Sequence, residues 1–132
     1  MIILILERNL REKKWILIVE DEKDLAELMG EELQEEGFEY IHSSSAKDAK
    51  FKLDNQEFVC MLLDMNLEQG SGEDILRHIM RDKAVTNFST PVLVISGNLV
   101  DSRIKEIKER IQGALVKPFD METLINKIKS LI

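Results

Sequence analysis

The sequence predicts an α/β fold in which five βα units form a doubly wound, five-stranded parallel sheet. From residue 15 onward, five short apolar runs alternate with five segments of helical periodicity. Three of the runs are apolar throughout, which is typical of parallel strands that are covered on both faces. The chain has 132 residues, a length that suits one domain with one core.

The apolar runs are predicted to be strands because they are short, mostly branched or aromatic, and bounded by turn or polar residues. In chain order they cover residues 15–19, 38–42, 59–63, 92–95 and 114–116, and the first, third and fourth are the fully apolar ones. Pro91 fits the first residue of the fourth strand, where its missing N–H is tolerated. No internal repeat interrupts this alternation.

The segments between and after the strands are predicted to be amphipathic helices that cover the sheet. Their apolar stripes are Leu25, Leu28, Met29 and Leu33; Ala46, Ala49 and Leu53; Ile75, Leu76, Ile79 and Met80; Ile104, Ile107 and Ile111; and Leu124, Ile125, Ile128 and Leu131. Ser45, Ser71 and Asp120 stand where N-caps are expected. Residues 103–110 alternate in charge and are predicted to form an exposed helix with salt bridges.

Composition excludes several classes of protein. The formal net charge of −7 argues against nucleic acid as a direct partner, because DNA affinity is built largely from Lys and Arg contacts with phosphates. The single cysteine, Cys60, excludes an internal disulfide and is predicted to be a buried thiol. His42 and His78 lack the spacing of metal ligands and are predicted to lie on the surface.

The first residues do not fit the βα pattern. Residues 1–6 are apolar but too short to span a membrane, and no basic segment precedes them. We therefore expect neither a signal peptide nor a membrane partner, and we expect a cytoplasmic protein. Residues 1–14 are predicted to be an extension of unknown role, separate from a domain over residues 15–132. The extension is expected to pack on the domain or on a second copy, which would make a homodimer.

Polar residues end four of the predicted strands. Glu20 and Asp21 follow the first, Asp64 follows the third, Ser96 the fourth and Lys117 the fifth. In open α/β sheets, ligands bind beyond the carboxyl ends of the strands, so these side chains are expected to converge. Three crowded carboxylates would repel one another unless a cation lies among them, and oxygen ligands suit Mg²⁺. A cation with open positions can hold phosphoryl oxygens.

These residue types together predict phosphoryl transfer to an aspartate. Taken singly, an aspartate after a strand is usually a turn residue, and an acidic cluster is usually a solvated loop. Their combination favours Asp64 as a nucleophile that forms an aspartyl phosphate. Lys117 would neutralise one phosphoryl oxygen, Ser96 could donate to another, and Gly97 would leave room for the group.

The motifs around these positions resemble the response-regulator receiver family, of the chemotaxis-regulator type. They are residues 17–22 (LIVEDE), 63–67 (LDMNL), 70–72 (GSG), 94–97 (VISG) and 116–119 (VKPF), and the resemblance covers about residues 15–132. It implies a flavodoxin-like strand order of 2-1-3-4-5. It also implies a single-domain switch of two-component phosphorelay signalling, which catalyses only its own phosphorylation and dephosphorylation and is not otherwise an enzyme.

The resemblance also implies roles and partners. Asp64 becomes the phosphoacceptor, and the Mg²⁺ ligands become Glu20, Asp21, Asp64 and the backbone carbonyl of Asn66. In such proteins a histidine kinase or a histidine phosphotransfer protein supplies the phosphoryl group. The phosphorylated receiver then either regulates a downstream target protein or passes the group along a relay.

Two positions depart from the family pattern. Ser96 becomes the switch hydroxyl and Lys117 the site lysine, but the aromatic residue often found three positions before that lysine is Ala114 here. The switch must then be read through backbone movement near Ser96 and Gly97 and the following helix, or through another side chain. Glu68 replaces a proline common in the family, and this replacement is expected to loosen the loop over the phosphoacceptor.

Three other classes of protein share parts of this pattern. A phosphatase of the haloacid-dehalogenase type needs an aspartate two residues after its nucleophile, where this chain has Asn66. A flavodoxin cradles phosphate with its first loop, which here would repel an anion through Glu20, Asp21 and Glu22. A degenerate receiver that acts only as a phosphorylation-independent interaction module is supported by Ala114 alone.

Overall fold

Five parallel strands form the central layer of the protein, in the order β2-β1-β3-β4-β5. They are β1 (Lys14–Val19), β2 (Phe38–Ser43), β3 (Cys60–Asp64), β4 (Val92–Ser96) and β5 (Gly113–Val116). The predicted sheet and its strand order are therefore confirmed. The computed structural model describes residue 2 and residues 13–98 and 102–132. The expectations about residues 1–14 lie almost entirely outside the described residues.

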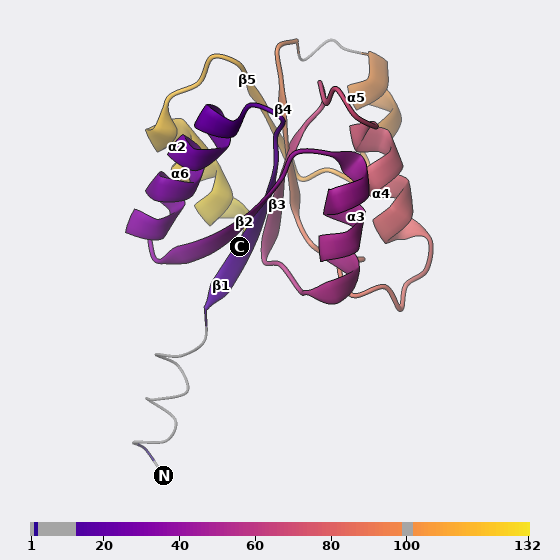
Figure 1. Ribbon diagram of the computed structural model, residues 1–132, viewed down its shortest axis with the longest axis horizontal. Coiled ribbons are helices and arrows are strands. Elements are labelled where there is room, and N and C mark those ends of the chain that lie inside the picture. The colour runs from indigo at the N-terminus through magenta and orange to yellow at the C-terminus, as the bar shows by residue number, and fades with distance from the viewer. Residues whose placement is uncertain (1, 3–12, 99–101) are drawn as a thin grey trace.

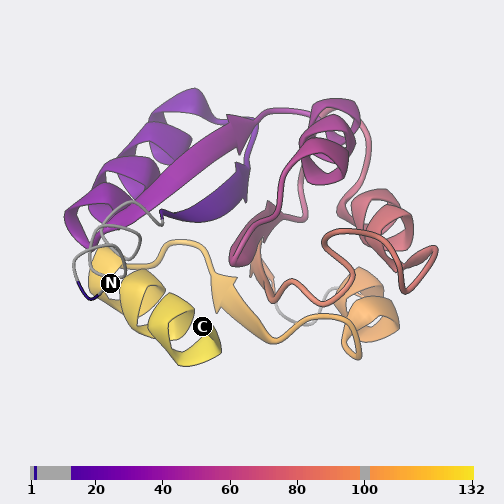
Figure 2. The ribbon, with the colours of Figure 1, turned by 90° about the horizontal axis from the view of Figure 1, so that it is seen from below.

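Helices cover both faces of the sheet. They are α2 (Lys23–Glu35), α3 (Ala46–Asn55), α4 (Gly72–Met80), α5 (Ser102–Ile107) and α6 (Met121–Leu131). Figure 1 shows α2 and α6 on one side of the sheet and α3, α4 and α5 on the other, and Figure 2 shows the same arrangement from below. The fold is thus doubly wound, as predicted. Within the described ranges, no helix has the length and apolarity that a membrane crossing requires.

The core consists of two apolar layers, one on each face of the sheet. Along β1, Ile16 and Ile18 pack with the layer under α2 and α6, whereas Leu17 and Val19 pack with the layer under α3 and α4. All four are buried, because successive side chains of a strand point to opposite faces. Each such side chain contributes roughly 1.5–3 kcal/mol through burial. The layers hold the strand ends in fixed register, which positions the site.

Two predicted core residues are exposed instead: Leu28 and Met80 are 47% and 46% exposed. The buried face of α2 comprises Ala26, Met29, Gly30 and Leu33. Glycine occupies one of these positions, where Tyr40 packs closely against the helix. A Cβ atom on Gly30 would lie 2.3 Å from Cζ of Tyr40. Of the predicted stripe on this helix, Leu28 alone lies off the buried face, whereas Met29 and Leu33 are fully buried.

The predicted N-caps are confirmed. The side chains of Ser45, Ser71 and Asp120 each accept a hydrogen bond from the backbone N–H three residues later, at 3.2, 3.1 and 2.7 Å. These bonds satisfy donors that a helix start leaves free, and they fix where α3, α4 and α6 begin.

The loop that precedes β4 is anchored by Asn87, whose side chain is fully buried. Its Oδ1 accepts from the N–H of Phe58 and the hydroxyl of Thr90, both at 2.9 Å, and its Nδ2 donates to the carbonyls of Leu53 and Gln56, at 2.7 and 2.8 Å. One amide thus joins the end of α3, the start of β3 and the approach to β4.

The prediction of an exposed, salt-bridged helix over residues 103–110 is partly wrong. Helix α5 ends at Ile107, so Ile111 lies beyond it. Arg110 is half-buried and donates from Nη2 to the carbonyls of Phe88 and Thr90, at 2.9 and 3.1 Å. Its guanidinium thus satisfies carbonyls of the loop before β4, which charge alternation along a helix could not indicate.

Candidate functional site

The structure brings together the polar residues that were predicted to converge. Glu20 and Asp21 directly follow β1, Asp64 is the last residue of β3, Ser96 is the last of β4, and Lys117 directly follows β5. Strands β1, β3, β4 and β5 are neighbours in this order and run parallel. Their carboxyl ends therefore meet at one edge of the sheet, where open α/β sheets place ligands.

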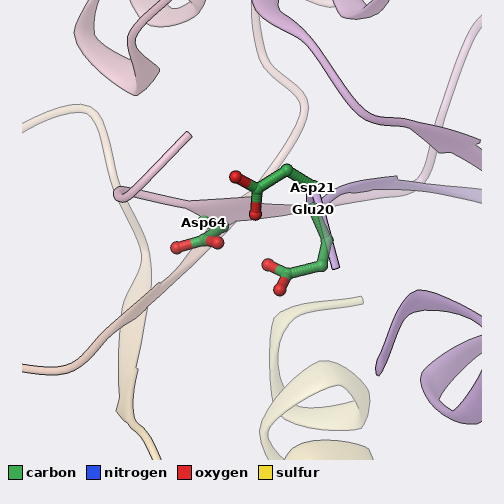
Figure 3. A group of neighbouring side chains, drawn as sticks. All are labelled: Glu20, Asp21 and Asp64. Atoms are coloured by element: carbon green, nitrogen blue, oxygen red, sulfur yellow. The ribbon is translucent and has the colours of Figure 1, made fainter. Parts of the chain in front are cut away.

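Three carboxylates form the centre of the site. Figure 3 shows Glu20, Asp21 and Asp64 gathered around one space, and their ligand oxygens lie within 4.8 Å of one another. Glu20 and Asp64 are each 1% exposed. Within the described part of the chain, the buried Oε2 of Glu20 has no hydrogen-bond partner. This set of hard oxygen donors, with one oxygen unsatisfied, fits a divalent cation such as Mg²⁺.

Lys117 is the positive charge of the site. Its Nζ lies 3.3 Å from Oε1 of Glu20 and 3.3 Å from Oδ2 of Asp64. Burial lowers the pKa of Lys117, but the carboxylates of Asp64 and Glu20 outweigh this effect and hold the pKa above its ordinary value. Lys117 is therefore charged at neutral pH and is placed beside the oxygen that would carry a phosphoryl group.

Glu20 holds its proton unusually tightly. Burial, followed by the neighbouring carboxyl of Asp64, raises the pKa of Glu20 from 4.5 to about 8, although Lys117 acts in the opposite direction. At neutral pH and without a cation, Glu20 is therefore largely protonated. A divalent cation would have to displace this proton in order to use both oxygens of Glu20.

We therefore expect Mg²⁺ binding to strengthen as pH rises toward about 8. The folded-state pKa of Glu20, about 8, lies above its ordinary value of 4.5. The metal-free protein therefore loses stability as pH rises from 4.5 to about 8. Thermal melting with and without Mg²⁺ should show a larger upward shift of Tm at pH 8 than at pH 6. The Glu20→Gln variant should lose this difference, and a pH-independent shift in the wild type would contradict the expectation.

The loop after Asp64 is held by backbone hydrogen bonds. The N–H of Asn66 donates to Oδ1 of Asp64 at 2.9 Å, and the N–H of Met65 donates to the carbonyl of Ile95 at 3.0 Å. The N–H of Glu68 donates to Oδ2 of Asp21 at 3.1 Å. A proline at position 68 could not make this bond. The backbone N–H of Glu68 thus ties the loop to the acidic cluster, and the expectation that Glu68 loosens the loop stays a prediction.

Ser96 is 1% exposed, and its hydroxyl engages its own loop. The Oγ donates to the carbonyl of Asn98 at 3.1 Å and accepts from the N–H of Asn98 at 3.2 Å. A Cβ atom on Gly97 would meet none of the described residues within 4 Å, so these residues leave open space beside it. The roles of Ser96 as a donor to a phosphoryl oxygen and of the Asn66 carbonyl as a metal ligand stay predictions.

Two residues around the site were missed by the sequence reasoning. His42 was predicted to lie on the surface, but it is half-buried and its Nε2 donates to the carbonyl of Glu20 at 2.5 Å. Arg103 donates to the carbonyl of Met65 at 2.8 Å. The position of His42 at the end of β2, beside β1, is a signal that could have indicated the first contact. No sequence signal indicates the second, because a long side chain spans two segments far apart in the chain.

Comparison with known proteins agrees with this geometry. The family model described as "Response regulator receiver domain" matches residues 16–129. The chain therefore belongs to the response regulator receiver domain family, whose members are signalling switches of two-component systems.

Its relatives include longer proteins. The cell cycle transcriptional regulator CtrA of Caulobacter vibrioides is 25% identical over 118 residues, which are 89% of this chain and 49% of that protein. The phosphate regulon transcriptional regulatory protein PhoB of Escherichia coli is 26% identical over 117 residues, 89% of this chain and 51% of that protein. The chain thus spans about half the length of the curated relatives it matches.

Solved structures share the fold. The chemotaxis protein CheY4 of Vibrio cholerae superimposes with a TM-score of 0.83 at 22% identity, covering 92% of this chain and 100% of that one. The receiver domain of a sensor histidine kinase from Pseudomonas aeruginosa, with a magnesium ion coordinated in its active-site cleft, has a TM-score of 0.80 at 19% identity and covers 91% of this chain and 98% of that one.

Proposed function

We propose that this chain is a phosphorylation-dependent switch in which Asp64 accepts a phosphoryl group from a histidine kinase or a histidine phosphotransfer protein. The observation that carries the proposal is the placement of Asp64. It is buried, belongs to a cluster of three carboxylates within 4.8 Å, and has the Lys117 ammonium 3.3 Å away. Membership of the receiver family supports the same function.

The proposed transfer requires little covalent chemistry from the protein. A carboxylate oxygen of Asp64 attacks the phosphorus atom, and the P–N bond of the donor phosphohistidine breaks. Its electron pair returns to the imidazole, so an acyl phosphate and a histidine result. Lys117 neutralises charge beside the attacking carboxylate, and the open space next to Gly97 leaves room for the group.

A bound Mg²⁺ ion would supply the remaining positive charge for the phosphoryl oxygens. Glu20, Asp21, Asp64 and the backbone carbonyl of Asn66 are the groups that we propose hold it. The unsatisfied, buried Oε2 of Glu20 supports this set, because a buried carboxylate oxygen without a partner is unfavourable. The receiver domain of the Pseudomonas aeruginosa sensor histidine kinase, which shares the fold and has a magnesium ion in its active-site cleft, supports it further.

The remaining assignments follow from the same proposal. The phosphorylated chain regulates a downstream protein or relays the group, without acting as an enzyme on a separate substrate. Two relatives are named as transcriptional regulators, but this chain spans about half of their length and has a net charge of −7. The net charge favours a protein partner over direct DNA contact, and we propose a cytoplasmic location. Residues 15–132 are proposed as the receiver domain and residues 1–14 as an extension, whose last residue, Lys14, already belongs to β1.

Intact-protein mass after incubation with acetyl phosphate tests the proposal. We expect a gain of one phosphoryl group with Mg²⁺ and none with a chelator. If the phosphorylated product is too short-lived to detect, a parallel titration with beryllofluoride, a stable analogue of the phosphoryl group, tests the same site. If neither labelling nor beryllofluoride binding occurs under any condition, the proposal fails, and a phosphorylation-independent interaction module becomes the better description.

The Lys117→Ala variant should damage the phosphorylation response more than the fold. Removal of the ammonium leaves the two buried carboxyl groups of Glu20 and Asp64 without their counter-charge. Protonation of Glu20 limits the loss of stability. Acetyl phosphate labelling should slow strongly, while Tm changes by a few degrees at most. The exposed Lys105, on α5, provides the matched Lys→Ala control, which should label like the wild type. Labelling of Lys117→Ala at the wild-type rate would contradict its role.

A further inference from the structure

Arg103 connects helix α5 to the loop that follows Asp64. Its Nη1 donates to the carbonyl of Met65 at 2.8 Å, and its Nη2 donates to Oδ1 of Asn66 at 3.1 Å. Arg103 is the second residue of α5, the helix that follows Ser96 in the chain. One side chain thus ties the helix after β4 to the loop after β3. This loop begins at the residue that follows the proposed phosphoacceptor, Asp64.

Glu73, at the start of α4, offers Arg103 a second partner. Its Oε1 lies 3.9 Å from Nε of Arg103, too far for a hydrogen bond. The side chain of Glu73 is only 16% exposed, and within the described ranges its buried Oε1 has no hydrogen-bond partner. A buried carboxylate oxygen without a partner is unfavourable, so a movement of Arg103 toward Glu73 would satisfy it.

These contacts define two arrangements of Arg103. In the present one, the contacts of the guanidinium include two hydrogen bonds to neutral acceptors of the loop. In the other, it would exchange them for a charge-assisted bond to Glu73, which is stronger for each bond made. A displacement of the loop that breaks the two bonds would therefore favour the bond to Glu73.

The side chain at position 114 cannot make such a connection. The position where the family often carries an aromatic residue is a partly buried alanine, which packs against the apolar layer under α3, α4 and α5. Alanine has no side-chain torsion that could report the state of the site. Arg103 already touches both the loop and the helix that must move relative to each other.

We propose that Arg103 is the positioning residue that couples the Asp64 loop to α5, bonded to Met65 and Asn66 in the resting protein and to Glu73 after phosphorylation. The proposal rests on the proposed function, since phosphorylation at Asp64 is what displaces the loop. Glu73 also lines the groove between α4 and α5, so the exchange would change the charge at this groove.

Hydrogen exchange over α5, measured by mass spectrometry, tests the coupling with Mg²⁺ and beryllofluoride as the probe. Wild-type protein should change its protection over residues 102–107 when the probe binds. Arg103→Gln should still be labelled on Asp64 by acetyl phosphate, but its change in α5 protection should fall by about fivefold or more. Arg77→Gln removes an exposed guanidinium from the neighbouring helix α4 and should respond like the wild type.

Glu73→Gln provides a second variant, which removes the charge of the other partner and leaves the bonds to the loop in place. It should also reduce the α5 response, and it keeps the proposal testable if Arg103→Gln fails to fold. A full response in a folded Arg103→Gln, or no response of α5 in labelled wild type, would overturn the coupling alone. A wild type that neither labels nor binds beryllofluoride would overturn the proposed function and the coupling with it.

Discussion

Replacing Asp64 with asparagine is expected to abolish labelling by acetyl phosphate. The amide lacks the anionic oxygen that attacks phosphorus, so no acyl phosphate can form. The fold should persist because the change is nearly isosteric, and the amide oxygen can still accept from the N–H of Asn66, as Oδ1 of Asp64 does at 2.9 Å. Intact-protein mass should show no added phosphoryl group in the variant, whether or not Mg²⁺ is present.

A matched control separates the loss of the nucleophile from a general effect of charge. Asp54→Asn changes an exposed aspartate of α3, whose carboxylate pairs with His78 and Arg81. This variant should be labelled like the wild type. Removing Asp64 also takes one of the crowded carboxylates away from Glu20, so Tm of the metal-free variant should be unchanged or higher. Stoichiometric labelling of Asp64→Asn would show that the phosphoacceptor lies elsewhere.

The second large effect concerns stability. The Asn87→Ala variant should unfold with a free energy lower by about 3 to 4 kcal/mol, because it leaves buried backbone groups without hydrogen bonds. The N–H of Phe58 and the carbonyls of Leu53 and Gln56 would all lose their partner. Urea unfolding followed by circular dichroism should show a lower midpoint with an unchanged dependence on urea concentration.

Asn126→Ala is the control for this change. Asn126 lies exposed on α6, so its loss should alter the free energy of unfolding by no more than about 0.5 kcal/mol. Asn87→Asp adds a graded test: the side chain keeps its acceptor for Phe58 but loses the donor to the two carbonyls, so it should also be clearly destabilised. A loss below about 1 kcal/mol in Asn87→Ala would mean that water replaces the amide.

Most of the site's location was predictable from the sequence. Asp64 and Ser96 were expected at strand ends and are the last residues of β3 and β4. This succeeded because a buried parallel strand is a continuous apolar run, so its first polar residue marks its carboxyl end. Glu20 and Lys117 follow by the same rule, and parallel pairing then brings all of them to one edge.

The contacts around the site were not predictable in the same way. Arg103 reaches Met65 across 38 positions of the chain, and His42 reaches the carbonyl of Glu20 across 22. Both bonds join side chains to backbone atoms, which any residue offers, so no pairing of residue types signals them. Packing was equally hard to predict. Leu28 is exposed, whereas Gly30 lies on the buried face of α2, where Tyr40 packs against it.

The sequence by itself determined the five βα units, the caps that start three helices, and the residue types that meet at the carboxyl edge of the sheet. These depend on periodicity and on the nature of each residue, which are local properties. Only the tertiary structure decided the proton held by Glu20, the anchoring of the loop by Asn87 and the contacts of Arg103 with the loop after β3 and with Glu73. Burial and distance between segments produce these features, and neither quantity exists until the chain has packed.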